Sequence, residues 1–142
     1  IEWLDEQFAD AAKRKLRIFI CTHVPIHKNL PPDRAWYVKP KNGQTRFYEL
    51  VREHRKRIVA IVHGHFHNGL RGWDDRAPIH ELCCPSLLYN SDRKLASKNA
   101  PGYNLPEFRP GYLRAELAAD FLKLDYKPLG KEIEATKLIR FT

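Results

Sequence analysis

Residues 58 to 68 read IVAIVHGHFHN, an apolar run followed at once by three histidines at alternate positions. The apolar part, Ile58 to Val62, is unbroken and rich in β-branched residues. Such a run predicts a strand that lies at the centre of a parallel sheet and is buried on both faces. The histidines fall just past the carboxyl end of this strand, which is the edge where α/β sheets form ligand sites. The same stretch therefore points to both a fold class and a site.

The segment before this strand has the same order of elements. Glu2 to Lys15 carries apolar residues at helical spacing, and Leu16 to Cys21 reads as a short buried strand that leads to His23. A proline-rich loop over Val24 to Asn42 and a second helix over Thr45 to Arg57 follow. Helix, strand, loop, helix and strand in this order predict an α/β layer with parallel strands.

The last part of the chain has a different pattern. Ile79 to Cys84 is a candidate strand, and Pro85 to Pro110 is irregular. Gly111 to Ala118 and Phe121 to Tyr126 alternate in polarity and lie two residues apart, which predicts a β-hairpin. The 142 residues show no internal boundary, so we expect one domain over 1–142.

Composition excludes some classes of protein. The chain is 43% hydrophobic and 30% charged, as in a globular protein, and its apolar runs are too short for a membrane span. An odd count of 3 cysteines favours a reduced chain, so we expect a cytoplasmic protein. The net charge of +8 attracts anions, but no zinc-finger spacing or aromatic RNA-binding signature accompanies it. Most of the cations are therefore expected on solvated faces.

Histidine placement indicates a metal site. His23 follows one predicted strand and His65 and His67 follow the other, so parallel strands bring them to one edge. Imidazole nitrogen suits zinc, iron, manganese and nickel. In extended backbone His65 and His67 point the same way, and Gly64 removes a side chain where the backbone turns near a ligand.

This arrangement resembles the C-terminal half of the calcineurin-like metallophosphoesterases. The similar blocks are a strand ending in THVP at 22–25 and a strand ending in GHFH at 64–67. WLDEQF at 3–8 and PGYLRAEL at 110–117 are similar to the flanking helix and the closing hairpin of that family. The resemblance implies an α/β fold in which a metallophosphoesterase-type β-sandwich with mixed sheets is flanked by helices and ends in a β-hairpin.

The resemblance also implies a chemistry. His23 and His65 would bind one divalent metal ion and His67 a second, the ions being Mn, Fe, Zn or Ni about 3.5–4 Å apart. A hydroxide held between them would attack a phosphate mono- or diester in line. The protein would then position the substrate and stabilise the developing charge.

Three other blocks of the family pattern are absent from this chain. They carry the bridging aspartate, the second carboxylate, the asparagine and the catalytic histidine, so the catalytic residues are not assigned here. We expect the chain to be the C-terminal part of one domain whose N-terminal half is absent. Its open sheet edge then needs that half, or self-association, to cover it. Alone, it is expected to bind metal weakly and to turn over little phosphate ester.

Four further residues are candidates for contact with substrate or for support of a ligand. His63 precedes the motif and is expected to be packed, or to hold a ligand in place, rather than to bind metal itself. His27 and Arg34 lie in loops near the predicted site, where each can contact a phosphate group or remain solvated. Asn68 follows His67 and can either fix the turn or contact substrate.

Two alternatives stay open. In the first, the chain is a non-catalytic basic α/β module that holds an anionic partner, and the histidines are structural. In the second, the three histidines and one carboxylate hold a single structural zinc ion, which commonly takes four ligands.

Overall fold

A computed structural model describes residues 1–26, 38–65, 67, 69–70, 79–88 and 110–141. Most of the loop predicted over Val24 to Asn42 and of the irregular segment over Pro85 to Pro110 lies outside these residues. The first elements along the chain are helix α1 (Glu2–Lys13), strand β1 (Ile18–Thr22), the short 3-10 helix η1 (Pro40–Asn42), helix α2 (Gln44–Glu53), strand β2 (Ile58–His63) and strand β3 (Glu81–Cys83). Both predicted helices and all three predicted strands in this part are confirmed, with boundaries that differ by a few residues.

The first sheet is parallel, as predicted. Its order is β1-β2-β3, and both neighbouring pairs run in the same direction. Strand β2 is central, and its residues from Val59 to His63 are all buried. The prediction of a central strand buried on both faces is therefore confirmed.

The second sheet is antiparallel and contains β4 (Gly111–Leu117), β5 (Phe121–Pro128) and β6 (Ala135–Arg140), in that order. The predicted hairpin is confirmed, with Leu117 opposite Leu122 beside its turn. The sequence did not predict β6. The expectation of mixed sheets is wrong for the described residues, because parallel and antiparallel strands are separated into two sheets of one kind each.

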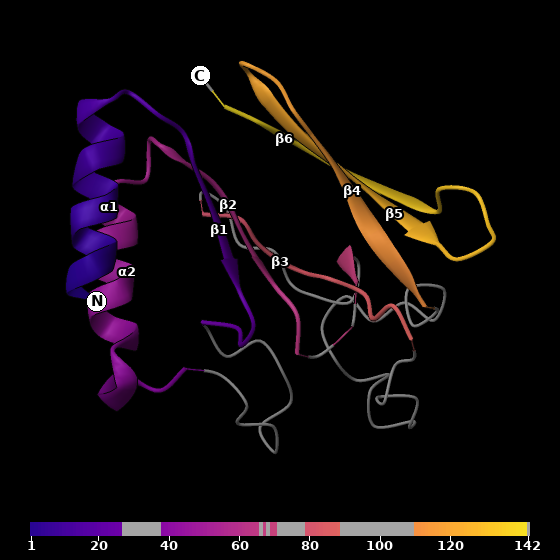
Figure 1. Ribbon diagram of the computed structural model, residues 1–142, viewed down its shortest axis with the longest axis horizontal. Helices are drawn as coiled ribbons and strands as arrows, with labels where there is room; N and C mark the ends of the chain where they lie inside the picture. Colours follow the sequence, from indigo (N-terminus) through magenta and orange to yellow (C-terminus); the bar gives the residue numbers. More distant parts are fainter. Residues whose placement is uncertain (27–37, 66, 68, 71–78, 89–109, 142) are drawn as a thin grey trace.

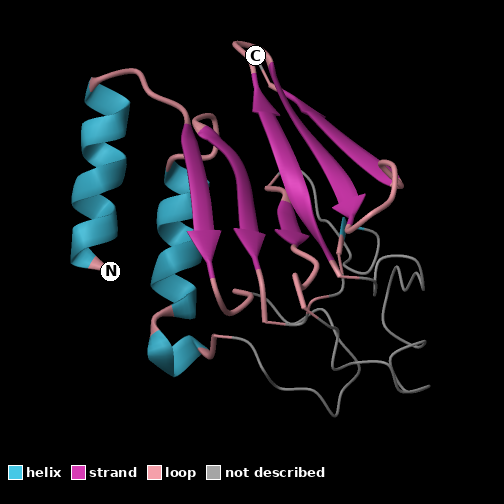
Figure 2. Cartoon of the chain, turned by 45° about the vertical axis from the view of Figure 1, so that its right-hand side comes forward, coloured by secondary structure: helices cyan, strands magenta, loops and turns pink. Residues whose placement is uncertain are grey.

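Three layers result, as Figures 1 and 2 show: two helices, the parallel sheet and the antiparallel sheet. One cluster of buried residues joins α1 and α2 to the parallel sheet through Phe8, Leu50 and Ile61. A second cluster joins the two sheets, with Val62 and Leu82 on one side and Leu122, Leu124, Tyr126 and Ile139 on the other. The class is therefore α/β, with two sheets packed face to face and helices over one of them.

A buried carboxylate ties the antiparallel sheet together. Asp125 on β5 lies opposite Arg114 on β4 and Thr136 on β6. The Thr136 hydroxyl donates to Asp125 Oδ1 at 2.7 Å, and the Arg114 guanidinium donates to Oδ2 at 2.8 Å. The hydrogen bond from Thr136, followed by the one from Arg114, lowers the pKa of Asp125 from 3.8 to about 2. One side chain thus links all three strands of the sheet.

Replacing Asp125 with asparagine is expected to lower the free energy of unfolding by about 1–2 kcal/mol at pH 7. This value is discounted because Arg114 is 61% exposed and Lys123, which also faces the carboxylate, is 35% exposed. The folded pKa lies below the unfolded one, so the stabilisation is present above about pH 4 and is lost as pH falls to about 2. Denaturant unfolding at several pH values measures it. Asp120→Asn is the control, because Asp120 is 67% exposed and 3.7 Å from Arg140; a loss as large as that of Asp125→Asn contradicts the prediction.

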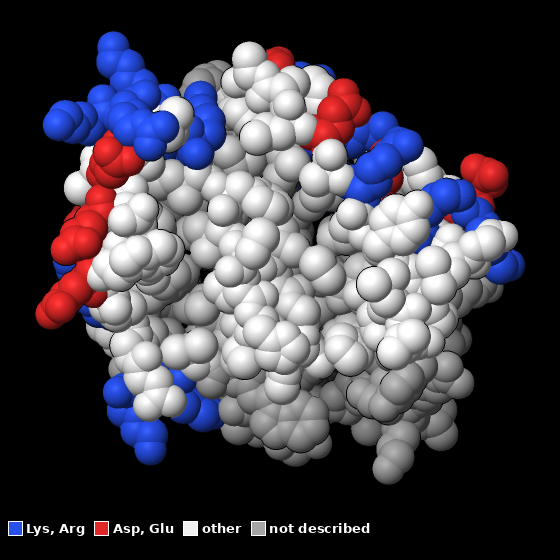
Figure 3. Space-filling view, viewed as in Figure 1, with Lys and Arg blue, Asp and Glu red and all other residues white. Residues whose placement is uncertain are grey.

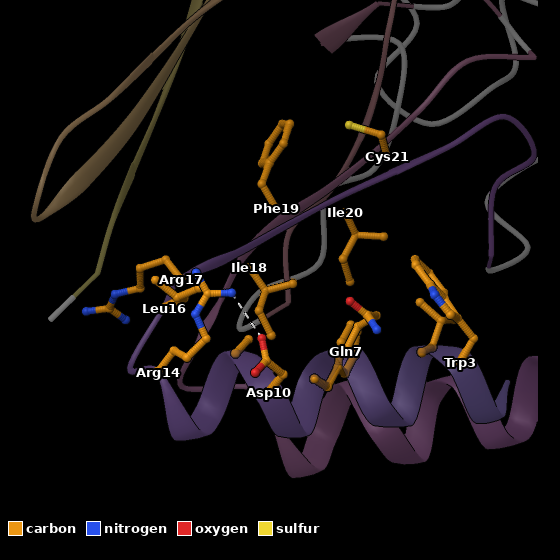
Figure 4. A pocket seen from close by; sticks show the side chains of 13 residues that line it. Trp3, Gln7, Asp10, Arg14, Leu16, Arg17, Ile18, Phe19, Ile20 and Cys21 are labelled. Carbon is orange, nitrogen blue, oxygen red and sulfur yellow. Dashed lines mark hydrogen bonds and ion pairs between the residues drawn. The ribbon is translucent and has the colours of Figure 1, made fainter.

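Strand β1 forms one edge of the parallel sheet among the described strands. Phe19, which is 40% exposed, and Cys21 lie on the side of β1 away from α1, whereas Ile18 and Ile20 point toward the helix (Figure 4). A shallow hollow of about 400 Å³ runs between α1 and this edge, with Trp3 and Phe19 among its lining residues. An open strand edge with apolar side chains is a surface on which another strand can pair.

Candidate metal centre

The carboxyl ends of β1 and β2 bring two of the predicted ligands together. Thr22 is paired with His63 at the last position of the parallel ladder, so the residues that follow each strand are neighbours. His65 Nδ1 lies 3.2 Å from His23 Nε2, although the residues are 42 positions apart. The ring centroids are 5.2 Å apart and the ring planes meet at 87°. The predicted convergence of His23 and His65 is therefore present in the structure.

Hydrogen bonds around Gly64 hold this pair in register. The Gly64 amide donates to the His23 carbonyl at 3.2 Å, which joins the two histidine-bearing segments by backbone alone. The Gly64 carbonyl accepts from His63 Nδ1 at 3.0 Å and from the Cys83 thiol at 3.7 Å. The amide and the carbonyl of Gly64 are thus both held by hydrogen bonds, to the His23 backbone and to side chains of β2 and β3.

The backbone at the motif differs from the expected extended form. His65 and His67 have φ angles of 62° and 61°, in the left-handed region. A non-glycine residue there costs about 1–3 kcal/mol, and such conformations cluster at functional sites. The prediction that His65 and His67 lie in extended backbone is therefore wrong, because a pleated strand does not continue through them.

Burial and charge keep the His65 ring neutral near pH 7. Partial burial, followed by the neighbouring charges of His23 and His67, holds the pKa of His65 below its ordinary value of 6.5. A neutral imidazole keeps a lone pair for a metal ion, whereas imidazolium has none. The smallest of these contributions to the lowered pKa of His65 comes from His67.

The loop that carries His23 is fixed by two side chains that the sequence did not single out. The buried Glu81 carboxylate on β3 accepts the Ile26 amide at 2.8 Å through Oε1. The Gln44 side-chain amide, at the start of α2, donates to the Ile26 carbonyl. Ile26 is itself buried in the core beneath the helices. The sequence feature that could have indicated the role of Glu81 is its position, as an acidic residue, within the predicted strand at 79–84.

His63 is 1% exposed and lies at the end of β2. Its contact with the Gly64 carbonyl matches a supporting role for the turn. His27, Arg34 and Asn68 lie outside the described residues. A β-carbon added at Gly64 would lie 3.6 Å from His23 Nδ1, an ordinary contact, so close packing against His23 does not require glycine there.

Residues of the described part of the chain form no group of three or more His, Cys, Asp or Glu side chains arranged to hold a metal ion. The site seen here is a histidine pair with His67 close enough to influence it. Imidazole nitrogens on adjacent loops are the donor type that zinc, manganese, iron or nickel accepts. The pair fits as part of a ligand set.

The three cysteines, all within the described residues, form no disulfide: Cys21 is exposed, Cys83 is buried and Cys84 is partly buried. Burial, followed by the nearby Cys21, raises the pKa of Cys84 to about 11. Cys84 is therefore a neutral thiol at pH 7 and a poor metal ligand or nucleophile.

Comparisons with known proteins add no assignment. No protein-family model matches the chain. No curated protein matches it either. Among the described residues, no helix is long and apolar enough to cross a membrane.

Proposed function

We propose that the chain is the C-terminal part of a metal-dependent phosphoesterase of the calcineurin-like kind. The observation that carries the proposal is the contact between His23 Nε2 and His65 Nδ1. Two nitrogens that share one ion at about 2.0–2.1 Å each, at angles of 90–109°, lie about 2.9–3.4 Å apart. The observed 3.2 Å falls within that range, and the lowered pKa of His65 supports the neutral, ligating form.

The metal ions, two in the proposed centre, would supply a bound hydroxide and polarise the phosphoryl oxygens. The chain's own residues supply orientation. The Gly64 amide donates to the His23 carbonyl, so the two segments that carry the histidines are held side by side at the end of the parallel ladder. The substrate is a phosphate mono- or diester, with the remaining ligands and the acid–base residues contributed by an N-terminal half.

Metal analysis and hydrolysis of an aryl phosphate mono- and diester test the proposal. They are run on this chain and on the same chain extended by its native upstream sequence. The extended protein is expected to bind two metal ions and to hydrolyse an ester, while the 142-residue chain binds metal weakly. One tightly bound ion whose removal unfolds the chain supports a structural zinc site instead. Robust turnover by the 142-residue chain contradicts the assignment of missing groups to another segment.

We also propose that the open edge of β1 is covered by a further strand, from the N-terminal half or from a second copy of the chain. The support is the exposed Phe19 on that edge and the hollow between β1 and α1. A row of edge amides and carbonyls beside an exposed aromatic ring favours strand addition.

Changing Phe19 to lysine is therefore expected to shift the 142-residue chain toward the monomer, because a charge on an edge strand opposes pairing. Light scattering with size-exclusion chromatography measures the change at several concentrations. Leu138→Lys is the matched control, since Leu138 is 47% exposed but lies on β6 of the other sheet. A chain that is already monomeric at high concentration, or an equal response to Leu138→Lys, rules out self-association through β1.

A further inference from the structure

A basic region lies at the end of the parallel strands opposite the histidine pair. Helices α1 and α2 end there, at Lys13 and Glu53, and strands β1 and β2 begin there, at Ile18 and Ile58. Six cations gather around this end; we call them the basic strip: Lys15, Arg17, Arg55, Lys56, Arg57 and Arg140. Figure 3 shows part of this region as the blue cluster at the upper left, over the end of α1.

The strip is hollowed along its length. One hollow of about 560 Å³ is lined by Lys15, Arg17, Lys56 and Arg57, with His54 beside them. A second hollow of about 470 Å³ is lined by Arg55, Lys56 and Arg140, with His80 and Phe141. Lys56 belongs to both, so the two hollows adjoin. Two adjoining basic hollows fit an extended polyanion better than a single phosphate group.

Little of this charge is neutralised within the described part of the chain. Arg140 approaches Asp120 at 3.7 Å, and both side chains are largely exposed. Glu53 lines the first hollow but pairs with Arg46 at 3.5 Å. Among the described residues, no ion pair involves Lys15, Lys56 or Arg57. Helix dipoles do not account for the excess, because two helix C-termini together carry only about one negative charge.

Lys15 itself lies where glycine is preferred. Its φ angle is 57°, and the Leu16 amide donates to the Ala11 carbonyl at 2.8 Å, closing the end of α1 in a Schellman arrangement. A left-handed conformation costs an L-residue about 1–2 kcal/mol relative to glycine. The chain therefore has a lysine at a position where its charge faces the first hollow and its backbone is strained.

We propose that the basic strip binds the sugar–phosphate backbone of single-stranded nucleic acid without sequence preference. The cations would track successive phosphates, with the Arg17 guanidinium held over Phe141 at 4.8 Å from the ring centroid. A membrane surface is less suited, because the region is hollowed rather than projecting. This inference does not rest on the histidine pair, which lies at the other end of the parallel strands.

Fluorescence anisotropy with a labelled thymidine oligonucleotide of about 20 residues tests it. The 142-residue chain is expected to bind at about 50 mM salt and to weaken steeply by 200 mM. The double variant Lys15→Gln/Lys56→Gln is expected to bind at least ~10-fold more weakly and to flatten the log–log salt slope by about 1.4. The control Lys41→Gln/Lys131→Gln removes the same charge from two exposed lysines elsewhere and is expected to change affinity less than ~2-fold.

His23→Ala is expected to leave oligonucleotide binding unchanged, which separates this inference from the phosphoesterase proposal. If the first double variant does not fold by circular dichroism, Arg55→Gln/Lys56→Gln replaces it with the same expectation. The inference is overturned by no binding at about 50 mM salt or by equal losses in the control. Binding to phosphatidylserine vesicles in place of the oligonucleotide overturns it as well and points to a membrane surface.

Discussion

Replacing His65 with alanine is expected to lower the affinity of the protein extended by its native upstream sequence for Zn²⁺ or Mn²⁺ by at least about 100-fold at pH 7.5. The reason is that even residues that only support a ligand are worth 10–100-fold in metal affinity, and a direct ligand is worth no less. His65 Nδ1 and His23 Nε2 are 3.2 Å apart, so His23→Ala is expected to have the same effect. Isothermal titration calorimetry measures the affinity, and the rise in melting temperature with added metal gives a second readout.

His54→Ala is the matched control for this prediction. His54 is the C-cap residue of α2 and packs edge-to-face against Phe8, with ring centroids 5.4 Å apart. Its loss removes an imidazole from the same chain but not from the histidine pair. Unchanged metal affinity in both His23→Ala and His65→Ala shows that the pair is a structural hydrogen bond, and the metallophosphoesterase proposal then fails.

The second large effect is expected from removing the Glu81 side chain, which should lower both the stability of the protein and its affinity for metal. Glu81→Ala is expected to lower the free energy of unfolding by about 2–3 kcal/mol, because it leaves the buried Ile26 amide without its side-chain acceptor. The His23 loop is then held by fewer bonds, and metal affinity is expected to fall about 10-fold or more. Glu81 thus acts as a positioning residue for His23 rather than as a ligand.

Two variants separate this role from a general loss of stability. Glu81→Gln keeps an oxygen that can accept the Ile26 amide and is expected to retain most of the metal affinity. Glu116→Ala removes an exposed carboxylate from β4 and is expected to change neither quantity measurably. Metal affinity that stays at the parent level in Glu81→Ala, under conditions where the protein is folded, contradicts the positioning role.

Local sequence patterns predicted most of the described elements for identifiable reasons. The run at Ile58–Val62 and the alternation in Gly111–Leu117 are signals that neighbouring residues carry by themselves. Strand β6 carries no such signal, since Leu138 is 47% exposed beside Ile139, which is 4% exposed. Its place depends on pairing with β5, as in the contact of Thr136 with Asp125.

In the candidate site, too, some features follow from the local sequence and others only from the tertiary structure. The sequence by itself predicted that His23 and the histidines after β2 follow parallel strands, because the alternation of helices and strands indicates that the strands run in the same direction. That β1 and β2 are neighbours in the sheet is seen only in the structure. Only the tertiary structure decided that His23 and His65 meet at 3.2 Å, that His65 and His67 adopt left-handed backbone, and that Glu81 fixes the His23 loop. The histidine contact and the Glu81 contact join residues 42 and 55 positions apart, which local periodicity does not encode.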